Sequence, residues 1–171
     1  TTSQIDRQNI LNNDLAIDEV QQTLDIKTVC WNGKYYLTKE LLAAYFAVEI
    51  RTVERYISNH TDELTANGYE VLKGARLREF IDAYNLTFAT DINVGRKIRS
   101  LGVFDFRAFL NMAMLLSESE PAKALRQFML DVVIDLINRK TVERSISTSA
   151  TKISFSLLCK KITIDASLQM L

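Results

Sequence analysis

Residues 38–60 carry the pattern that most constrains how this chain can fold. The segment TKELLAAYFAVEIRTVERYISNH predicts two short helices joined by a tight turn, with the Thr38 hydroxyl capping the first helix. Ala47 and Val48 fall at the turn between them. The small or apolar residues that should lie between the helices are Ala43, Val53 and Tyr56.

The second helix of this pair should present a mixed polar surface. Its outward residues are Ile50, Arg51, Thr52, Glu54, Arg55, Ser58 and Asn59. Arg51 and Arg55 share a face, as side chains that probe a DNA groove should. The spacing is typical of a DNA-reading helix-turn-helix. An ordinary antiparallel helix pair with a solvated charged face is the alternative.

The turn of the pair departs from the usual pattern. Ala47 stands where such units most often have glycine. A positive φ angle at this position would strain an alanine by roughly 1 kcal/mol, unless the turn takes a different form. Glu49 precedes the second helix and is a weaker cap than Ser or Asp, although its charge suits a helix N-terminus.

The charged residues sum to zero but are unevenly distributed. A net charge of +0 argues against strong nonspecific affinity for nucleic acid. Residues 1–30 have five acids and two bases, whereas residues 73–107 have seven bases and four acids. Candidates for phosphate contacts are Lys39, His60, Lys73, Arg76 and Arg78, and a further cluster is Arg96, Lys97 and Arg99. Solvated surface charge is the alternative for either basic cluster.

Turn dipeptides predict the strands. Asn32-Gly33 joins two β-rich runs, KTVCW and KYYL, into a hairpin. Asn67-Gly68 precedes a short strand that by analogy would be a wing beside the second helix. Residues 98–105 predict another strand, in which Gly102 indicates a bulge.

Helical periodicity marks three later segments. The first covers residues 76–84, and the second begins at its cap Asp105 and runs to about Leu116. The third covers residues 121–139 and has an apolar face that is either core or an interface with a second copy. We therefore predict an α+β, mainly helical fold: a winged helix-turn-helix-like unit with short β-hairpins, followed by long amphipathic helices.

The domain boundaries follow from composition. Residues 1–26 predict an acidic, loosely amphipathic lead-in with Leu15, Val20 and Leu24 on one stripe. Residues 27–140 should form the helix-turn-helix domain with its supporting helices. Residues 141–171 predict a Ser/Thr-rich linker and a short tail of one or two strands.

Residue types argue against several other functions. His60 is the single histidine, no Cys/His pairs have zinc-ligand spacing, and five glycines form no phosphate loop. We therefore expect no enzyme, no metal and no cofactor. No apolar run approaches the roughly 20 residues that span a bilayer. Cys30 and Cys159 predict reduced core thiols, which favours a cytoplasmic location.

A family resemblance is visible in two blocks. The first block resembles the prophage-type DNA-binding proteins of the RhuM, Bro-N and KilA-N-like group, whose pattern is W-L-T-x-x-x-x-A-x-x-F-x-V-x-x-x-T-x-x-x-x-I. The matching residues are Tyr36 (in place of Trp), Leu37, Thr38, Ala43, Phe46, Val48, Thr52 and Ile57. A later run is similar to the family's helix, at Ala122, Lys123, Leu125, Arg126 and Phe128. The resemblance covers residues 27–140.

The resemblance implies a DNA-binding module of phage or mobile-element type, and it supplies no catalytic residues. We expect a sequence-selective transcription regulator that binds double-stranded DNA as a homodimer. Arg51 and Arg55 should contact base edges or phosphates, with Thr52, Ser58 and Asn59 assisting. The alternative is a protein-interaction module, an antirepressor or antitoxin that binds a repressor or toxin.

Overall fold

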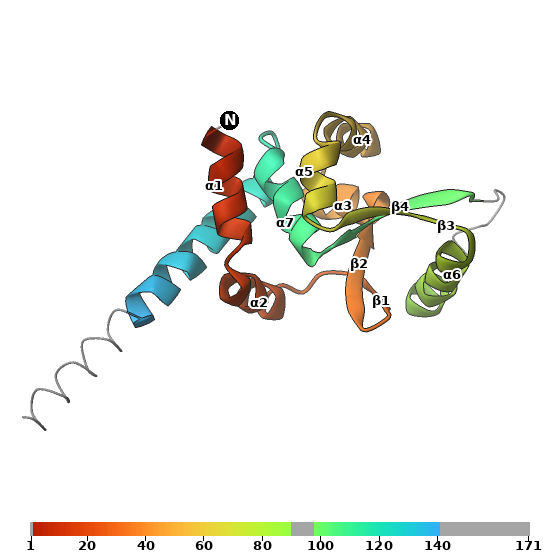
Figure 1. Ribbon diagram of the computed structural model, residues 1–171, viewed down its shortest axis with the longest axis horizontal. Coiled ribbons are helices and arrows are strands. Elements are labelled where there is room, and N and C mark those ends of the chain that lie inside the picture. The colour runs from red at the N-terminus through yellow and green to blue at the C-terminus, as the bar shows by residue number, and fades with distance from the viewer. Residues whose placement is uncertain (1, 90–97, 141–171) are drawn as a thin grey trace, which may run out of the picture. The chain divides into compact units, whose positions relative to one another are not determined.

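The computed structural model describes residues 2–89 and 98–140, and the chain divides into two compact units, residues 1–130 and 131–171. The elements of the first unit are α1 (Thr2–Leu11), α2 (Asp14–Thr23), β1 (Val29–Trp31), β2 (Lys34–Thr38), α3 (Lys39–Phe46), α4 (Ile50–Asn59), α5 (Thr61–Ala66), β3 (Tyr69–Lys73), α6 (Gly74–Phe88), β4 (Ser100–Asp105) and α7 (Phe106–Leu115) (Figure 1). Residues 120–140 form a further helix that begins in the first unit. The prediction of a mainly helical α+β fold is confirmed.

One antiparallel sheet organises the first unit, with strand order β1-β2-β4-β3. Asn32 and Gly33 have φ angles of 50° and 75°, so the predicted hairpin turn between β1 and β2 is confirmed. β4 comes late in the chain yet pairs with both β2 and β3. The two β segments predicted on either side of the helix pair therefore belong to one sheet.

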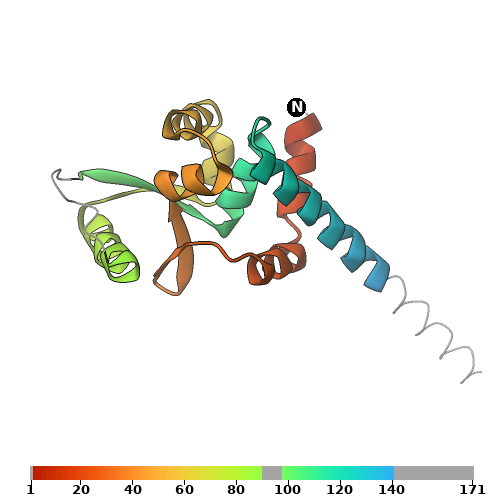
Figure 2. The same cartoon turned by 180° about the vertical axis from the view of Figure 1, so that it is seen from behind.

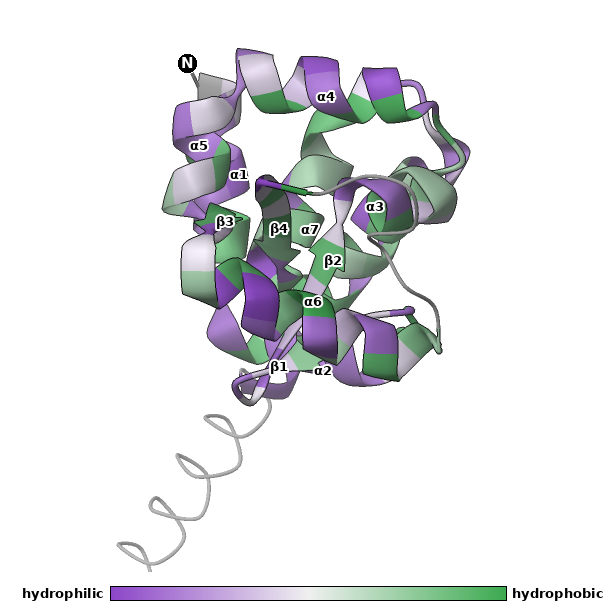
Figure 3. Cartoon of the chain, turned by 90° about the vertical axis from the view of Figure 1, so that its right-hand side faces the viewer, coloured by the Kyte–Doolittle hydropathy of each residue, from purple (hydrophilic) through white to green (hydrophobic). Residues whose placement is uncertain are grey.

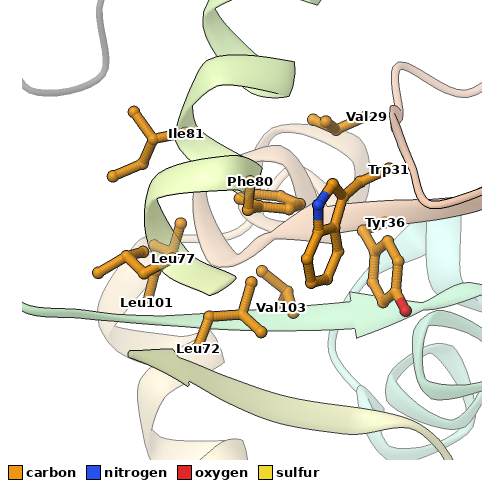
Figure 4. Close-up of a cluster of buried hydrophobic side chains, with 9 residues drawn as sticks. All are labelled: Val29, Trp31, Tyr36, Leu72, Leu77, Phe80, Ile81, Leu101 and Val103. Carbon is orange, nitrogen blue, oxygen red and sulfur yellow. The ribbon is translucent and has the colours of Figure 1, made fainter. Parts of the chain in front are cut away.

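The first face of the sheet is covered by α6. Leu77, Phe80 and Ile81 of this helix pack against buried residues of all four strands (Figure 4). The strand residues of this cluster are Val29, Trp31, Tyr36, Leu72, Leu101 and Val103. The apolar face predicted for residues 76–84 is thus confirmed, and the helix is longer at both ends.

The second face of the sheet packs against α3 and α7. Leu37 and Phe104 are register partners on β2 and β4, and their neighbour Tyr36 belongs to the opposite face. The rings of Phe46 of α3 and Phe109 of α7 stack with centroids 5.2 Å apart. Asp105 accepts a hydrogen bond of 2.9 Å from the amide of Ala108, which confirms the predicted cap of α7.

The first 26 residues contribute two packed helices to the first unit. Arg7 of α1 makes a two-hydrogen-bond ion pair with Glu63 of α5, at 2.7 and 2.8 Å. The predicted stripe is wrong at Leu15, which is 54% exposed, because the buried face of α2 runs through Ala16, Ile17 and Val20 instead. The buried residues here are Leu11, Ala16, Ile17 and Val20.

Two further sequence predictions are wrong. Gly102 forms no bulge, because the β3–β4 register runs through it without interruption. A Cβ atom at this position would lie 2.7 Å from the hydroxyl of Tyr69, so any other residue would have to displace the Tyr69 ring. Cys30 is a free thiol but exposed, because its side chain alternates with the buried Val29 and Trp31.

The apolar helix predicted at residues 121–139 is observed at residues 120–140. Ser119 accepts a hydrogen bond of 3.1 Å from the amide of Ala122 and so caps this helix. Leu125 and Met129 are buried, whereas Ile134 and Ile137 are exposed. The predicted tail strands, Cys159, Arg96 and Lys97 lie outside the described residues.

Candidate nucleic-acid interface

The turn between α3 and α4 contains a left-handed alanine. Thr38 caps α3 by accepting a hydrogen bond from the amide of Leu41, as predicted. Ala47 ends the helix with φ 52° and ψ 45°, and its amide donates to the carbonyl of Ala43. The positive φ considered from the sequence is therefore present, with an alanine in the position that favours glycine. Figure 2 shows the resulting pair of short helices beside the end of β2.

Helix α4 buries very little of its surface against the rest of the unit. Of the ten residues of α4, all of which the structure describes, Val53 alone is buried. Tyr56 was predicted to point inward but is only half-buried, because its ring stacks on His60 with centroids 6.0 Å apart. His60 ends α4, since its amide donates to the carbonyl of Tyr56. It is thus a helix end in this structure.

The outward face of α4 carries the arginines that the sequence predicted. The side chains of Ile50, Arg51, Glu54, Arg55, Ser58 and Asn59 are exposed, and Thr52 is half-buried. Arg51 has no ion-pair partner among the described residues. The Arg55 guanidinium lies 5.5 Å from the centre of the Tyr56 ring and 4.0 Å from Glu118, and its side chain is 57% exposed. Both cations are therefore accessible to a ligand.

A loop that sequence reasoning missed holds the helix pair in place. The buried Ser119 hydroxyl donates a 2.6 Å hydrogen bond to the carbonyl of Phe46, the last residue of α3. The Arg126 guanidinium donates to the carbonyls of Ala113 and Leu116 at the end of α7, at 2.6 Å each. These two contacts fix the 117–119 loop, which in turn fixes the turn at Ala47. Ser119 directly before a helix is the sign of this loop in the sequence. Its other partner, Phe46, lies 73 residues earlier in the chain, so the sequence around Ser119 does not show it.

The predicted phosphate contact Lys39 is already paired. Its ammonium donates a 2.5 Å hydrogen bond to a carboxylate oxygen of Glu54, which joins the start of α3 to the middle of α4. This hydrogen bond is the main reason that the pKa of Lys39 is raised. The ammonium stays charged at neutral pH, but its charge is offset by that of Glu54.

A groove of about 720 Å³ separates α4 from the β3–β4 ribbon. Glu54 and Ile57 line it from α4, and Tyr69 and Val71 line it from β3. Burial raises the pKa of the Tyr69 hydroxyl, which stays protonated at neutral pH. Two cations, Lys39 and Arg99, and two anions, Glu40 and Glu54, line the groove. Among the described residues these charges balance, so the lining that the structure describes carries no net positive charge to attract a phosphate.

The remaining basic candidates divide between the two faces of the sheet. Arg76 and Arg78 belong to α6, which covers the opposite face of the sheet, and Figure 3 shows α4 and α6 on opposite sides of the strands. Arg76 is paired with Glu70 at 2.9 Å and lies over the Trp31 ring. Lys73 alternates with the buried Leu72 and therefore points to the same side of the ribbon as Val71.

Comparison of the chain with models of protein families, with curated proteins and with solved structures found no match. Among the described residues, no three His, Cys, Asp or Glu side chains are grouped so that they could hold a metal ion. Within the same residues, none of the helices combines the length and the apolar character needed to cross a membrane. The functional inference therefore depends on the surface of α4.

Proposed function

We propose that this chain is a sequence-selective DNA-binding protein in which α4 enters the major groove. The observation that carries the proposal is the exposed face of α4, where Arg51 and Arg55 lie beside Ser58 and Asn59 on a helix with one buried residue. A reading helix must project from its support in this way to reach base edges. Arginine is also the side chain best suited to guanine, because its two donors match the O6 and N7 acceptors.

The other parts of the proposal follow from the same unit. The α3–turn–α4 arrangement with a β-ribbon beside it supports a winged helix-turn-helix, and the resemblance to the RhuM, Bro-N and KilA-N-like proteins supports a regulator of phage or mobile-element type. One such unit reads a half-site, so two copies should bind half-sites about one DNA turn apart. Lys73 remains the candidate for backbone contacts from the ribbon.

The test is selection from a random pool of duplex DNA, followed by a salt titration of binding to the recovered sequence. Wild type should recover a motif with two related half-sites. Arg51→Ala should weaken binding by on the order of 1–3 kcal/mol if the guanidinium makes a bidentate base contact. Arg78→Ala is the matched control, because this exposed arginine lies on α6 across the sheet and should leave the affinity unchanged.

A second candidate function is favoured by the pairing of the charges. Lys39 is neutralised by Glu54, and exposed Val71 lies at the same groove. A neutral surface with an apolar residue suits a protein partner better than a phosphate backbone. Absence of DNA binding by wild type at about 50 mM salt, where phosphate contacts are strong, would refute the DNA proposal and favour the antirepressor or antitoxin alternative.

A further inference from the structure

The Lys39–Glu54 pair is placed on the exposed side of the helix pair. The two side chains come from different helices, and they remain 35% and 49% exposed. An exposed ion pair contributes little to the stability of a fold. Helices α3 and α4 also contact each other, and each has a buried residue, Ala43 on α3 and Val53 on α4. The pair is therefore expected to add little to the stability of the two helices.

The position of Glu54 on α4 places it among the outward residues. It stands three residues after Arg51 and four before Ser58, and these spacings bring side chains onto one helix face. Ser58 donates its hydroxyl to the main-chain carbonyl of Glu54, at 3.0 Å. Glu54 thus lies at the edge of the face that carries Arg51 and Ser58, half-exposed and beside the groove of the β3–β4 ribbon, within reach of a DNA groove that receives that face.

A carboxylate in the major groove discriminates strongly between bases. It accepts hydrogen bonds and donates none, so it requires a base edge that donates. Cytosine presents the N4 amine with no acceptor beside it, and guanine presents only acceptors at O6 and N7. Adenine also presents an amine, N6, but its N7 acceptor lies beside that amine and disfavours a carboxylate. Phosphates also repel a carboxylate, unless a nearby cation offsets its charge. Lys39 supplies that cation and holds one of the two carboxylate oxygens.

We propose that Glu54 is a specificity-determining residue that accepts a hydrogen bond from the exocyclic amine of a cytosine, and that Lys39 is the positioning residue that fixes its carboxylate. This inference deepens the proposed DNA-binding function and rests on it. Oxygen Oε1 bonds to Lys39, so Oε2 is the oxygen available to the base. The base read by α4 next to the guanine contacted by an arginine should therefore be a cytosine.

The experiment uses the full chain and selection from random duplex DNA, with wild type and three variants selected in parallel. Glu54→Gln should change the preferred base at one position from cytosine to adenine, because a glutamine amide matches the adenine N6 and N7 edge. The ratio of affinities for the two bases should change by about fivefold to 150-fold, the range of a good base contact. Lys39→Met should reduce the preference for cytosine several-fold and leave the rest of the motif intact.

Glu40→Gln is the matched control. Glu40 is an exposed glutamate that lines the same groove, so this variant removes one negative charge near Lys39 and leaves the Lys39–Glu54 hydrogen bond in place. It should raise affinity for all sequences slightly and leave every base preference unchanged.

The outcomes separate the two proposals. A Glu54→Gln motif identical to the wild-type motif would overturn the role of Glu54 while leaving DNA binding in place. An unchanged cytosine preference in Lys39→Met would overturn the positioning role of Lys39. Absence of any DNA binding by wild type would overturn both this inference and the proposed function.

Discussion

Replacing Ala47 with glycine should stabilise the protein, although glycine is usually a destabilising substitution within a helix. The side chain of Ala47 is exposed, so its removal loses no buried contact. Its φ of 52° and ψ of 45° lie in the left-handed region, where a residue with a Cβ atom pays roughly 1–2 kcal/mol. Glycine avoids that strain but loses about 0.4–1 kcal/mol through the greater freedom of the unfolded chain. The net gain should be roughly 0.5–1 kcal/mol.

The measurement is urea unfolding monitored by circular dichroism. Wild type and variant are compared with the same slope of unfolding free energy against urea concentration. For a chain of 171 residues, this gain corresponds to a rise in Tm of about 1–4 °C. Ala44→Gly is the matched control, since Ala44 is also exposed but lies within α3 in helical conformation. There glycine should cost about 0.5–1 kcal/mol.

The two glycine variants must therefore shift stability in opposite directions. If Ala47→Gly lowers the free energy of unfolding as much as Ala44→Gly does, the left-handed turn carries no strain and the reasoning is refuted. If Ala47→Gly raises the free energy of unfolding and leaves the DNA affinity unchanged, the strain at this turn affects the stability of the fold and not DNA binding. A loss of affinity with increased stability would instead show that α4 depends on a stiff turn, since glycine widens the range of conformations at Ala47.

Two predictions concern the dependence of stability on pH. Glu63→Gln removes the charge that Arg7 holds and should cost about 3 kcal/mol at pH 7, as expected for a mostly buried pair. The hydrogen bond from Arg7 lowers the pKa of Glu63 in the folded protein. The stability that this pair contributes is therefore fully present above the unfolded pKa of about 4.3, and it is lost as the pH falls through the lowered folded pKa. Urea unfolding from pH 7 to pH 3 should show a weaker acid dependence in the variant, and an equal dependence would contradict the assignment. Burial raises the pKa of Asp105, so its ionised form costs stability as pH rises from the unfolded pKa through the folded pKa. Asp105→Asn keeps an acceptor for the Ala108 amide, so its free energy of unfolding at pH 7 should match or exceed that of wild type. Asp105→Ala loses the helix cap and should be less stable by about 1 kcal/mol. An Asn variant as unstable as the Ala variant would show that the charge itself is needed.

The local elements of this fold could be predicted because their causes lie within a few residues. Asn32-Gly33 provides the positive φ angles of a hairpin turn, and the prediction needs no knowledge of the rest of the chain. Thr38 and Asp105 each cap a helix through an amide three residues later. In the same way, the spacing of apolar residues in α6 identified its buried face before the sheet that it covers was known.

The remaining features depend on residues that are distant in sequence. Gly102 was interpreted as a bulge because glycine in a strand has several explanations, and the one that applies here is the Tyr69 ring on the neighbouring strand. Helix α1 is held by Glu63, 56 residues later, so a window around Arg7 contains no sign of its partner. The position of β4 between β2 and β3 is likewise decided by long-range pairing.

The basic cluster at residues 73–78 shows why a candidate interface is the hardest part to predict. Lys73 and Arg76 are three residues apart, but Gly74 has a φ of 61° and redirects the chain from β3 into α6. Lys73 consequently points to the α4 side of the sheet, whereas Arg76 bonds to Glu70 on the other side. Charged residues that are close together in the sequence thus lie on two different surfaces of the protein. Among the described residues, the exposed cations on the α4 side include Arg51 and Arg55 on the helix, Lys73 on β3 and Arg99 at the groove. Because a few phosphate contacts provide little nonspecific affinity, the proposed DNA binding would depend on base contacts made by α4.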